Sequence, residues 1–301
     1  MSDQENKDVE ILKQLIENMD YSAMTDFATK KSHKELMRLR QIYKIKFGTD
    51  LMPELKINLP GIYKKTMLAL FTDPVEYDID TIYKCLKSDT SKNEIIEIFA
   101  SRPDWYLNKI KKLYAKKYNV DLEEQIKEGT LDDFKKLLLF ILECQRSTNE
   151  APDLDYCKRV AEDLEQEESE KLTVDSTIKI IFNQSSPQEM LIISKEYNKS
   201  TQKLITETID KNFKGNVRRL LNAILMAKIS PSEYYANLIY EAINESLLDE
   251  CARLLVTRAE IDLAQIKKYY KKLYENDITE DIRNKDSNEY TNLLIEICKN
   301  H

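Results

Sequence analysis

One spacing pattern recurs four times along this chain and constrains its fold more than any other feature. The segment "VTRAEIDLAQIKKYYKKLY" at residues 256–274 has a looser copy, "ASRPDWYLNKIKKLYAKKY", at residues 100–118. We take Arg102 and Arg258 as anchors, and the same downstream pattern places equivalent anchors at Lys31 and Ser185. The anchors lie 71, 83 and 73 residues apart. A fixed period of this kind is typical of a fold built from repeated units.

Six columns of apolar or aromatic residues follow each anchor without a gap. At offsets of 5, 8 and 12 residues from the four anchors stand Leu36, Leu107, Met190 and Leu263, then Leu39, Ile110, Ile193 and Ile266, then Tyr43, Tyr114, Tyr197 and Tyr270. At offsets of 24, 32 and 36 stand Leu55, Ile126, Ile209 and Ile282, then Tyr63, Phe134, Val217 and Tyr290, then Met67, Leu138, Leu221 and Leu294. Steps of three and four residues mark one face of a helix, so we expect these columns to form core.

The composition favours helices almost throughout. The 301 residues include only 4 Gly and 7 Pro, while 33% of the residues are charged. The second copy divides into five helical segments, at 75–87, 91–101, 104–118, 121–128 and 131–145. Ser91 and Glu94 resemble a capping box at the start of the second segment. We therefore predict an all-α chain of repeats with about five helices each.

The longest interval between anchors contains a polar, proline-containing segment, "CQRSTNEAPDLDY". The chain therefore divides along its length into two pairs of repeats with a longer join between them. The predicted boundaries are 9–72 for repeat 1, 75–143 for repeat 2, 144–155 for the linker, 156–228 for repeat 3 and 231–301 for repeat 4.

Several classes of function are disfavoured by composition. His33 and His301 are the only histidines, and the five cysteines contain no C-x-x-C, so zinc sites and His-dependent nucleophilic catalysis are not expected. No glycine-rich phosphate loop is present, and we expect no enzyme activity. A net charge of -7 argues against a nucleic-acid partner. No apolar run is long enough to span a membrane, and the polar N-terminus predicts a cytoplasmic protein.

The repeats resemble the annexin family over essentially the whole chain. Residues 256–274, followed by "ITEDIR" and "EYTNLLIEIC", resemble the fourth annexin repeat. The second repeat is similar through "IIEIFASR" and "DFKKLLLFIL", the third through "TETIDKNFKGNVRRLLNAIL", and the first through "KFGTDLMPELK" and "YKKTMLALF". The resemblance implies four annexin-type repeats arranged as a slightly curved disc, and the divergence suggests a protist branch such as the alpha-giardins.

Annexins bind acidic phospholipid through calcium, and this sequence departs from the family at the calcium site. The family pattern is a K-G-x-G-T turn between the first two helices and an acidic residue before the fifth helix, which caps the ion. The acidic position falls 27 residues after each anchor, at Asn58, Gly129, Asn212 and Lys285. The four first turns read "IENMD", "LKSDT", "EKLTV" and "INES", with no G-x-G-T. We expect the usual site to be degenerate in all four repeats.

Other oxygen ligands near the same turns predict a weak, non-standard calcium site. The candidates are Asp89, Thr90, Glu128, Asp132 and Asp133 in repeat 2, and Asp286 in repeat 4. The alternative is that these are solvated turn carboxylates, favourable near the start of the following helix.

Basic residues recur near the same turns and suggest direct contact with lipid phosphate. They are Lys56, Lys127, Lys211, Lys214 and Lys285. The alternative is an ordinary solvated surface, as expected of a chain with 33% charged residues.

A second family feature is a central polar channel between repeats 2 and 4. The matching positions are Asp78, Glu97, Arg102, Arg253, Arg258 and Asp262, which we expect to be buried and paired. Trp105, the only tryptophan, opens the third helix of repeat 2; since the family's membrane loops lie elsewhere, we expect it to pack rather than to enter a membrane.

Two functions remain open from the sequence. One is a peripheral membrane protein that binds anionic phospholipid with weakened or altered calcium dependence. The other is a calcium-independent helical scaffold, associated for example with a cytoskeletal protein. The lost calcium ligands favour the second, but the fourfold resemblance favours the first, which is the function that we predict.

Overall fold

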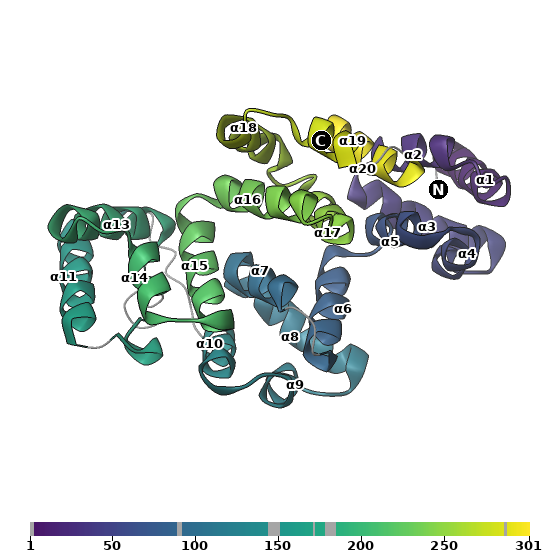
Figure 1. Cartoon of the computed structure of the whole chain (residues 1–301). Coiled ribbons are helices and arrows are strands. Elements are labelled where there is room, and N and C mark those ends of the chain that lie inside the picture. The colour runs from purple at the N-terminus through teal and green to yellow at the C-terminus, as the bar shows by residue number, and fades with distance from the viewer. Residues whose placement is uncertain (1–2, 89–91, 144–150, 171, 178–184, 286–287) are drawn as a thin grey trace. The chain divides into compact units, whose positions relative to one another are not determined.

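The computed structural model describes residues 3–88, 92–143, 151–170, 172–177, 185–285 and 288–301. All regular elements in these ranges are helices, and no strand occurs among them (Figure 1). The predicted all-α class is therefore confirmed. None of the described helices has the length and apolar character that crossing a membrane would require.

The chain forms two compact units that do not follow the pairing of repeats along the sequence. The first unit comprises Met1–Tyr77 and Ser232–His301, and the second comprises Asp78–Pro231. Repeat 1 thus folds with repeat 4, and repeat 2 folds with repeat 3. The longer join lies inside the second unit, between the two repeats that pack together there.

In the first unit, α2 packs against α20 and α5 packs against α17. Ser32 and Glu35 form a capping box at the start of α3, and Gly48 ends that helix with a left-handed φ of 73°. The helices of this unit are α1 (Asp3–Glu17), α2 (Tyr21–Thr29), α3 (His33–Phe47), α4 (Leu51–Asn58), α5 (Gly61–Leu70), α16 (Pro231–Asn244), α17 (Leu248–Arg258), α18 (Leu263–Tyr274), α19 (Ile278–Lys285) and α20 (Glu289–Asn300).

In the second unit, α7 packs against α15 and α11 packs against α13. Its helices are α6 (Pro74–Lys87), which enters this unit at Asp78, α7 (Asn93–Ser101), α8 (Asp104–Tyr118), α9 (Leu122–Gly129), α10 (Asp132–Glu143), α11 (Leu154–Glu170), α13 (Pro187–Thr201), α14 (Ile205–Asn212) and α15 (Gly215–Ile229). The five segments predicted for repeat 2 are the helices α6 to α10. Ser91 lies outside the described residues, and Lys92 stands at the N-cap of α7 without a side-chain cap.

The six repeat columns form the core of each repeat. Every column residue is buried except Val217, which is half-buried. The tyrosine column is completely buried, at 0% exposure in all four repeats. The fourfold pattern is therefore a packing pattern, in which each repeat turns the same stripe of its third helix inward.

Candidate functional site

In repeat 1 and in repeat 4, the turn between the first two helices lies next to the turn before the fifth helix. These are the two turns that would together hold an ion. In repeat 1, the Tyr63 hydroxyl at the start of α5 donates to the backbone carbonyl of Tyr21, at the start of α2, over 2.8 Å. In repeat 4, the Tyr290 hydroxyl makes the equivalent bond to the carbonyl of Leu248 over 2.7 Å. Both tyrosines occupy the same repeat column, so one residue position fixes the approach of the two turns.

The first turns keep a left-handed residue although they have lost glycine. Met19 has a φ of 54° and Ser246 a φ of 59°, at equivalent positions of repeats 1 and 4. The amide of Asp20 donates to Leu15, and the amide of Leu247 donates to Ala242, which closes both turns in the same way. A side chain in this conformation costs about 1 kcal/mol. The left-handed conformation could not be predicted from the sequence, because neither residue is a glycine.

At two of the four positions where a calcium-capping carboxylate is expected, the side chain forms a hydrogen bond with its own helix. The Asn58 amide donates to the carbonyl of Glu54 over 3.0 Å, and the Asn212 amide donates to Thr208 over 2.8 Å. Both bonds end on carbonyls of the helices that carry the amides, α4 and α14. In repeats 1 and 3 the cap position therefore carries an amide that serves the helix end.

At the cap position of repeat 4, a lysine reaches into the first turn. The Lys285 Nζ donates to the backbone carbonyl of Asn244 over 3.0 Å. An ion held by the usual site would be bound by carbonyls of this turn and by a carboxylate at position 285. Here the ammonium group supplies the positive charge to the carbonyl, and no carboxylate stands at that position.

In repeat 2, a lysine also donates to backbone carbonyls near the first turn, but it comes from a different position in the repeat. The Nζ of Lys92 donates to the backbone carbonyls of Cys85 and of Ser88, the latter over 2.6 Å. The cap residue Gly129 lies so close to α6 that a Cβ built there would be 2.5 Å from the carbonyl oxygen of Leu86. A glutamate or aspartate at position 129 is therefore sterically excluded unless the backbone moves.

The carboxylates predicted as alternative calcium ligands are exposed where they are described. Glu128 accepts a hydrogen bond from the Gln125 amide over 3.2 Å, and Asp133 pairs with Lys136 at 3.2 Å. Asp132 is exposed at the start of α10, and Asp89, Thr90 and Asp286 lie outside the described residues. Within the described ranges, no three His, Cys, Asp or Glu side chains gather in a group that could hold a metal ion. Calcium binding through these residues remains a prediction.

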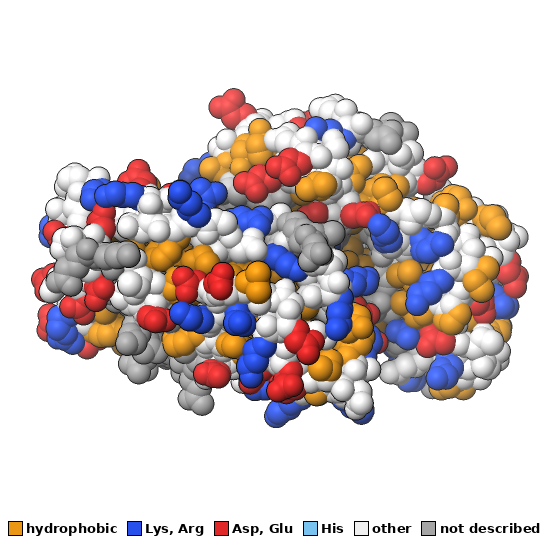
Figure 2. All heavy atoms as spheres, turned by 60° about the horizontal axis from the view of Figure 1, so that its bottom comes forward, with side chains coloured by type: hydrophobic (Ala, Val, Ile, Leu, Met, Phe, Trp, Pro, Cys, Tyr) orange, Lys and Arg blue, Asp and Glu red, His pale blue; other side chains and the backbone are white. Residues whose placement is uncertain are grey.

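The five turn lysines predicted to meet lipid phosphate are all exposed. Lys211 lies 3.8 Å from the Glu168 carboxylate. In the part of the chain that is described, no ion pair involves Lys56, Lys127 or Lys214. Figure 2 shows basic and acidic side chains interspersed on the face that it draws, without one large field of a single sign.

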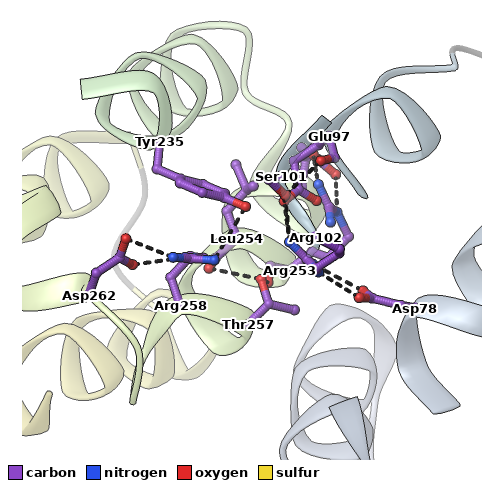
Figure 3. Close-up of polar contacts among 11 residues, drawn as sticks. Asp78, Glu97, Ser101, Arg102, Tyr235, Arg253, Leu254, Thr257, Arg258 and Asp262 are labelled. Atoms are coloured by element: carbon purple, nitrogen blue, oxygen red, sulfur yellow. Dashed lines mark hydrogen bonds and ion pairs between the residues drawn. The ribbon is translucent and has the colours of Figure 1, made fainter. Parts of the chain in front are cut away.

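In the second unit, the charged residues predicted for the polar channel form a buried ion cluster. The Arg102 guanidinium binds both carboxylate oxygens of Asp78, at 2.8 and 3.2 Å, and Glu97 at 2.7 Å (Figure 3). Asp78 and Glu97 are each 1% exposed. Fork-to-fork pairing of this kind offsets the cost of desolvating the charges.

In the first unit, the remaining predicted channel residues pair locally. Arg253 binds Glu250 at 2.6 and 2.9 Å, and Arg258 binds Asp262 at 2.7 and 2.8 Å. The Arg258 guanidinium also lies over the Tyr235 ring, 4.2 Å from its centroid (Figure 3). The sequence did not single out Glu250, which lies one turn before Arg253 on α17, or Tyr235, which lies on α16.

Trp105 is 68% exposed, so the expectation that it packs into the protein is wrong. It touches Tyr106 edge to face, with ring centroids 5.5 Å apart. Its position three residues after the anchor is also exposed in repeat 4, where Ile261 is 68% exposed.

Comparison with known proteins agrees with this architecture. The family model described as Annexin matches residues 77–141, 159–224 and 234–297. Annexin A11 of Mus musculus is 26% identical over 298 residues, which cover 97% of this chain and 59% of the relative. Annexin A13 of Mus musculus is 27% identical, covering 92% of this chain and 88% of the relative. The chain thus spans about 59% of the length of the annexin A11 relatives.

The solved structures extend the likeness to the whole described fold. A structure of an annexin A8 mutant has a TM-score of 0.91 at 26% identity, covering 98% of this chain and 94% of that one. Calcium-bound alpha-1 giardin has a TM-score of 0.80 at 17% identity, covering 99% of both chains. At that identity the giardin structure shows a shared fold only.

Proposed function

The chain belongs to the annexin family, and from this premise we propose that it is a peripheral membrane protein that binds anionic phospholipid with weakened calcium dependence. The family supports calcium-dependent phospholipid binding in general. The weakened dependence is specific to this chain, and we place the protein in the cytoplasm, at the membrane surface or at the cytoskeleton.

The bond from Lys285 to the Asn244 carbonyl carries the proposal. Calcium needs six to eight oxygen ligands, and a bidentate carboxylate normally supplies two of them. In repeat 4 the carboxylate is replaced by a cation that already satisfies a turn carbonyl. A calcium ion would have to displace the ammonium group and would then meet fewer ligands, so its affinity is low.

The Lys92 bonds and the close approach of Gly129 to Leu86 support the same conclusion for repeat 2. The exposed turn lysines then supply attraction to lipid phosphate without an ion. Each contributes about 1 kcal/mol near an anionic surface, and the attraction falls as salt screens it.

Liposome co-sedimentation tests the proposal. Vesicles of phosphatidylserine and phosphatidylcholine should pull the protein down in a chelator at low salt, and calcium should increase the bound fraction only modestly. Raising the salt should release the protein, while vesicles of phosphatidylcholine alone should not bind it. Binding that requires micromolar calcium would overturn the weakened dependence.

The alternative, a calcium-independent helical scaffold with a cytoskeletal partner, predicts a different outcome. It is favoured if the protein stays in the supernatant with every vesicle, with and without calcium. The replacement of all four capping carboxylates is the observation that keeps this function open.

A further inference from the structure

The outward face of α8 carries an unpaired basic stripe next to the only tryptophan. Trp105, Lys109, Lys112 and Lys116 follow one another at steps of four, three and four residues, and all are exposed. They lie on the side of the helix opposite the buried column residues. The only carboxylate on α8 is Asp104, in its first turn.

Two of the five lysines on α8 are paired with carboxylates, and within the described ranges the three lysines of the stripe are not. This difference distinguishes the stripe from an ordinary solvated face. Lys111 is bonded to Glu123, and Lys117 lies 2.6 Å from Asp80. No ion pair or hydrogen bond among the described residues involves the side chains of the other three, Lys109, Lys112 and Lys116. Lysines one turn apart repel each other slightly, so the spacing of these three lysines does not by itself stabilise the helix.

The same positions carry lysine in other repeats. The offsets of Lys112 and Lys116 from their anchor recur as an exposed lysine pair on α13 and on α18, formed by Lys195 and Lys199, and by Lys268 and Lys272. Only α8 adds a tryptophan and a third lysine to the pair.

The stripe is separate from the turns considered above. α7 leads from the first turn of repeat 2 to α8, and α9 leads from α8 back to the second turn. α7 has nine residues and is therefore about 13 Å long. The α8 face and the turns thus lie at opposite ends of these two helices.

We propose that the outward face of α8 is a second contact surface for anionic lipid, used without calcium. Unpaired lysines complement the phosphates of an acidic bilayer, and a tryptophan with its apolar body exposed is suited to the headgroup region. This surface does not depend on the turns, so it goes beyond the function proposed above.

Trp105 is a built-in reporter of this contact because the chain has no other tryptophan. Vesicles of phosphatidylserine and phosphatidylcholine, added in a chelator at low salt, should shift its emission to shorter wavelength and protect it from an aqueous quencher. Vesicles of phosphatidylcholine alone should leave the emission unchanged.

Two triple variants of equal charge change separate the surfaces. Replacing the stripe lysines (Lys109→Gln, Lys112→Gln, Lys116→Gln) should abolish the Trp105 shift and weaken the binding that it reports about a hundredfold, at about fivefold per lysine. The matched control replaces the turn lysines of the same unit (Lys127→Gln, Lys211→Gln, Lys214→Gln) and should retain the shift. Circular dichroism checks that both variants are folded.

The outcomes distinguish the two surfaces. Co-sedimentation with unchanged Trp105 emission would overturn the α8 surface and leave the turns in place. A shift that survives in the stripe variant would also overturn it. A shift caused by polyglutamate but not by vesicles would assign the face to an acidic protein partner and would rule out lipid. Unchanged co-sedimentation of the turn variant, with the Trp105 shift intact, would overturn only the proposed role of the turns.

Discussion

The ammonium group of Lys285 donates a hydrogen bond to the backbone carbonyl of Asn244, 3.0 Å away, across the two turns of repeat 4. Ser246, two residues after Asn244, keeps the left-handed conformation of the turn. The turn has thus kept its backbone path while a side-chain cation has taken a place next to its carbonyls. If the proposed function holds, we expect position 285 to set how this repeat responds to calcium.

Replacing Lys285 with glutamate should create calcium-dependent lipid binding in repeat 4. The substitution removes the ammonium group and puts a bidentate ligand at the cap position. Calcium should increase co-sedimentation of Lys285→Glu with phosphatidylserine vesicles more than it does for the native chain. Lys285→Gln, which frees the carbonyl without adding a carboxylate, is the control and should show no such gain. Equal responses of the two variants would contradict the role assigned to position 285.

Adding even a methyl group at Gly129 should destabilise repeat 2. Alanine usually stabilises a helix relative to glycine by about 1 kcal/mol. At position 129 its Cβ would lie 2.5 Å from the Leu86 carbonyl oxygen, and relieving such a clash costs about 1–3 kcal/mol. Urea unfolding of Gly129→Ala should therefore show a lower free energy of unfolding, and a stabilised variant would show that the approach is not tight.

Removing Arg102 should destabilise the second unit severely. Arg102→Leu removes the guanidinium that binds the buried carboxylates of Asp78 and Glu97, a change that costs about 3–5 kcal/mol. Lys65 pairs with Asp249 at the surface and has a side chain that is 67% exposed, so Lys65→Ala should cost less than about 1 kcal/mol. Denaturant unfolding of the two variants compares them directly. Similar losses would mean that the Arg102 cluster is not buried as described.

The core could be predicted from the sequence because side-chain spacing reports directly on one helix face. The column from Leu36 to Leu263 and the column from Tyr43 to Tyr270 are buried in all four repeats. The same register places the family's capping position at Lys285, by counting from Arg258. Local periodicity was sufficient for the core, whereas the expectation of a carboxylate at position 285 came from the resemblance to annexins.

The contacts of the turns could not be predicted in this way because they depend on the path of the backbone. Lys92 follows its first turn, and nothing in its spacing shows that its ammonium reaches the carbonyls of Cys85 and Ser88. Gly129 was recognised only as a missing carboxylate, whereas its role is to permit close approach to Leu86. Trp105 was expected to pack because the membrane loops of the family lie elsewhere, but its position on α8 turns it outward.

Within the buried tyrosine column, replacing tyrosine with phenylalanine should change the free energy of unfolding in different ways at different positions. The Tyr270 hydroxyl donates to Asp281 over 2.6 Å, whereas the buried Tyr114 hydroxyl has no partner among the described residues. Tyr270→Phe should lower the free energy of unfolding by about 1.5–3 kcal/mol, since it removes a bond to a charged group. Tyr114→Phe should leave it unchanged or raise it by about 1 kcal/mol, because it removes an unpaired polar group. Thermal unfolding of both variants is the measurement, and equal losses would contradict the assignment.

The two histidines predict a loss of stability in mild acid. Burial lowers the pKa of His33 and of His301, although the nearby Glu260 carboxylate opposes this shift in both cases. The unfolded chain, with a histidine pKa of about 6.5, then binds more protons than the folded chain. The stabilisation is therefore complete above about pH 6.5 and is lost as the pH falls toward the lowered folded pKa values. Between pH 7.5 and 5.5 the native chain should lose more unfolding free energy than the variant with His33→Gln and His301→Gln, and parallel pH profiles would contradict this origin.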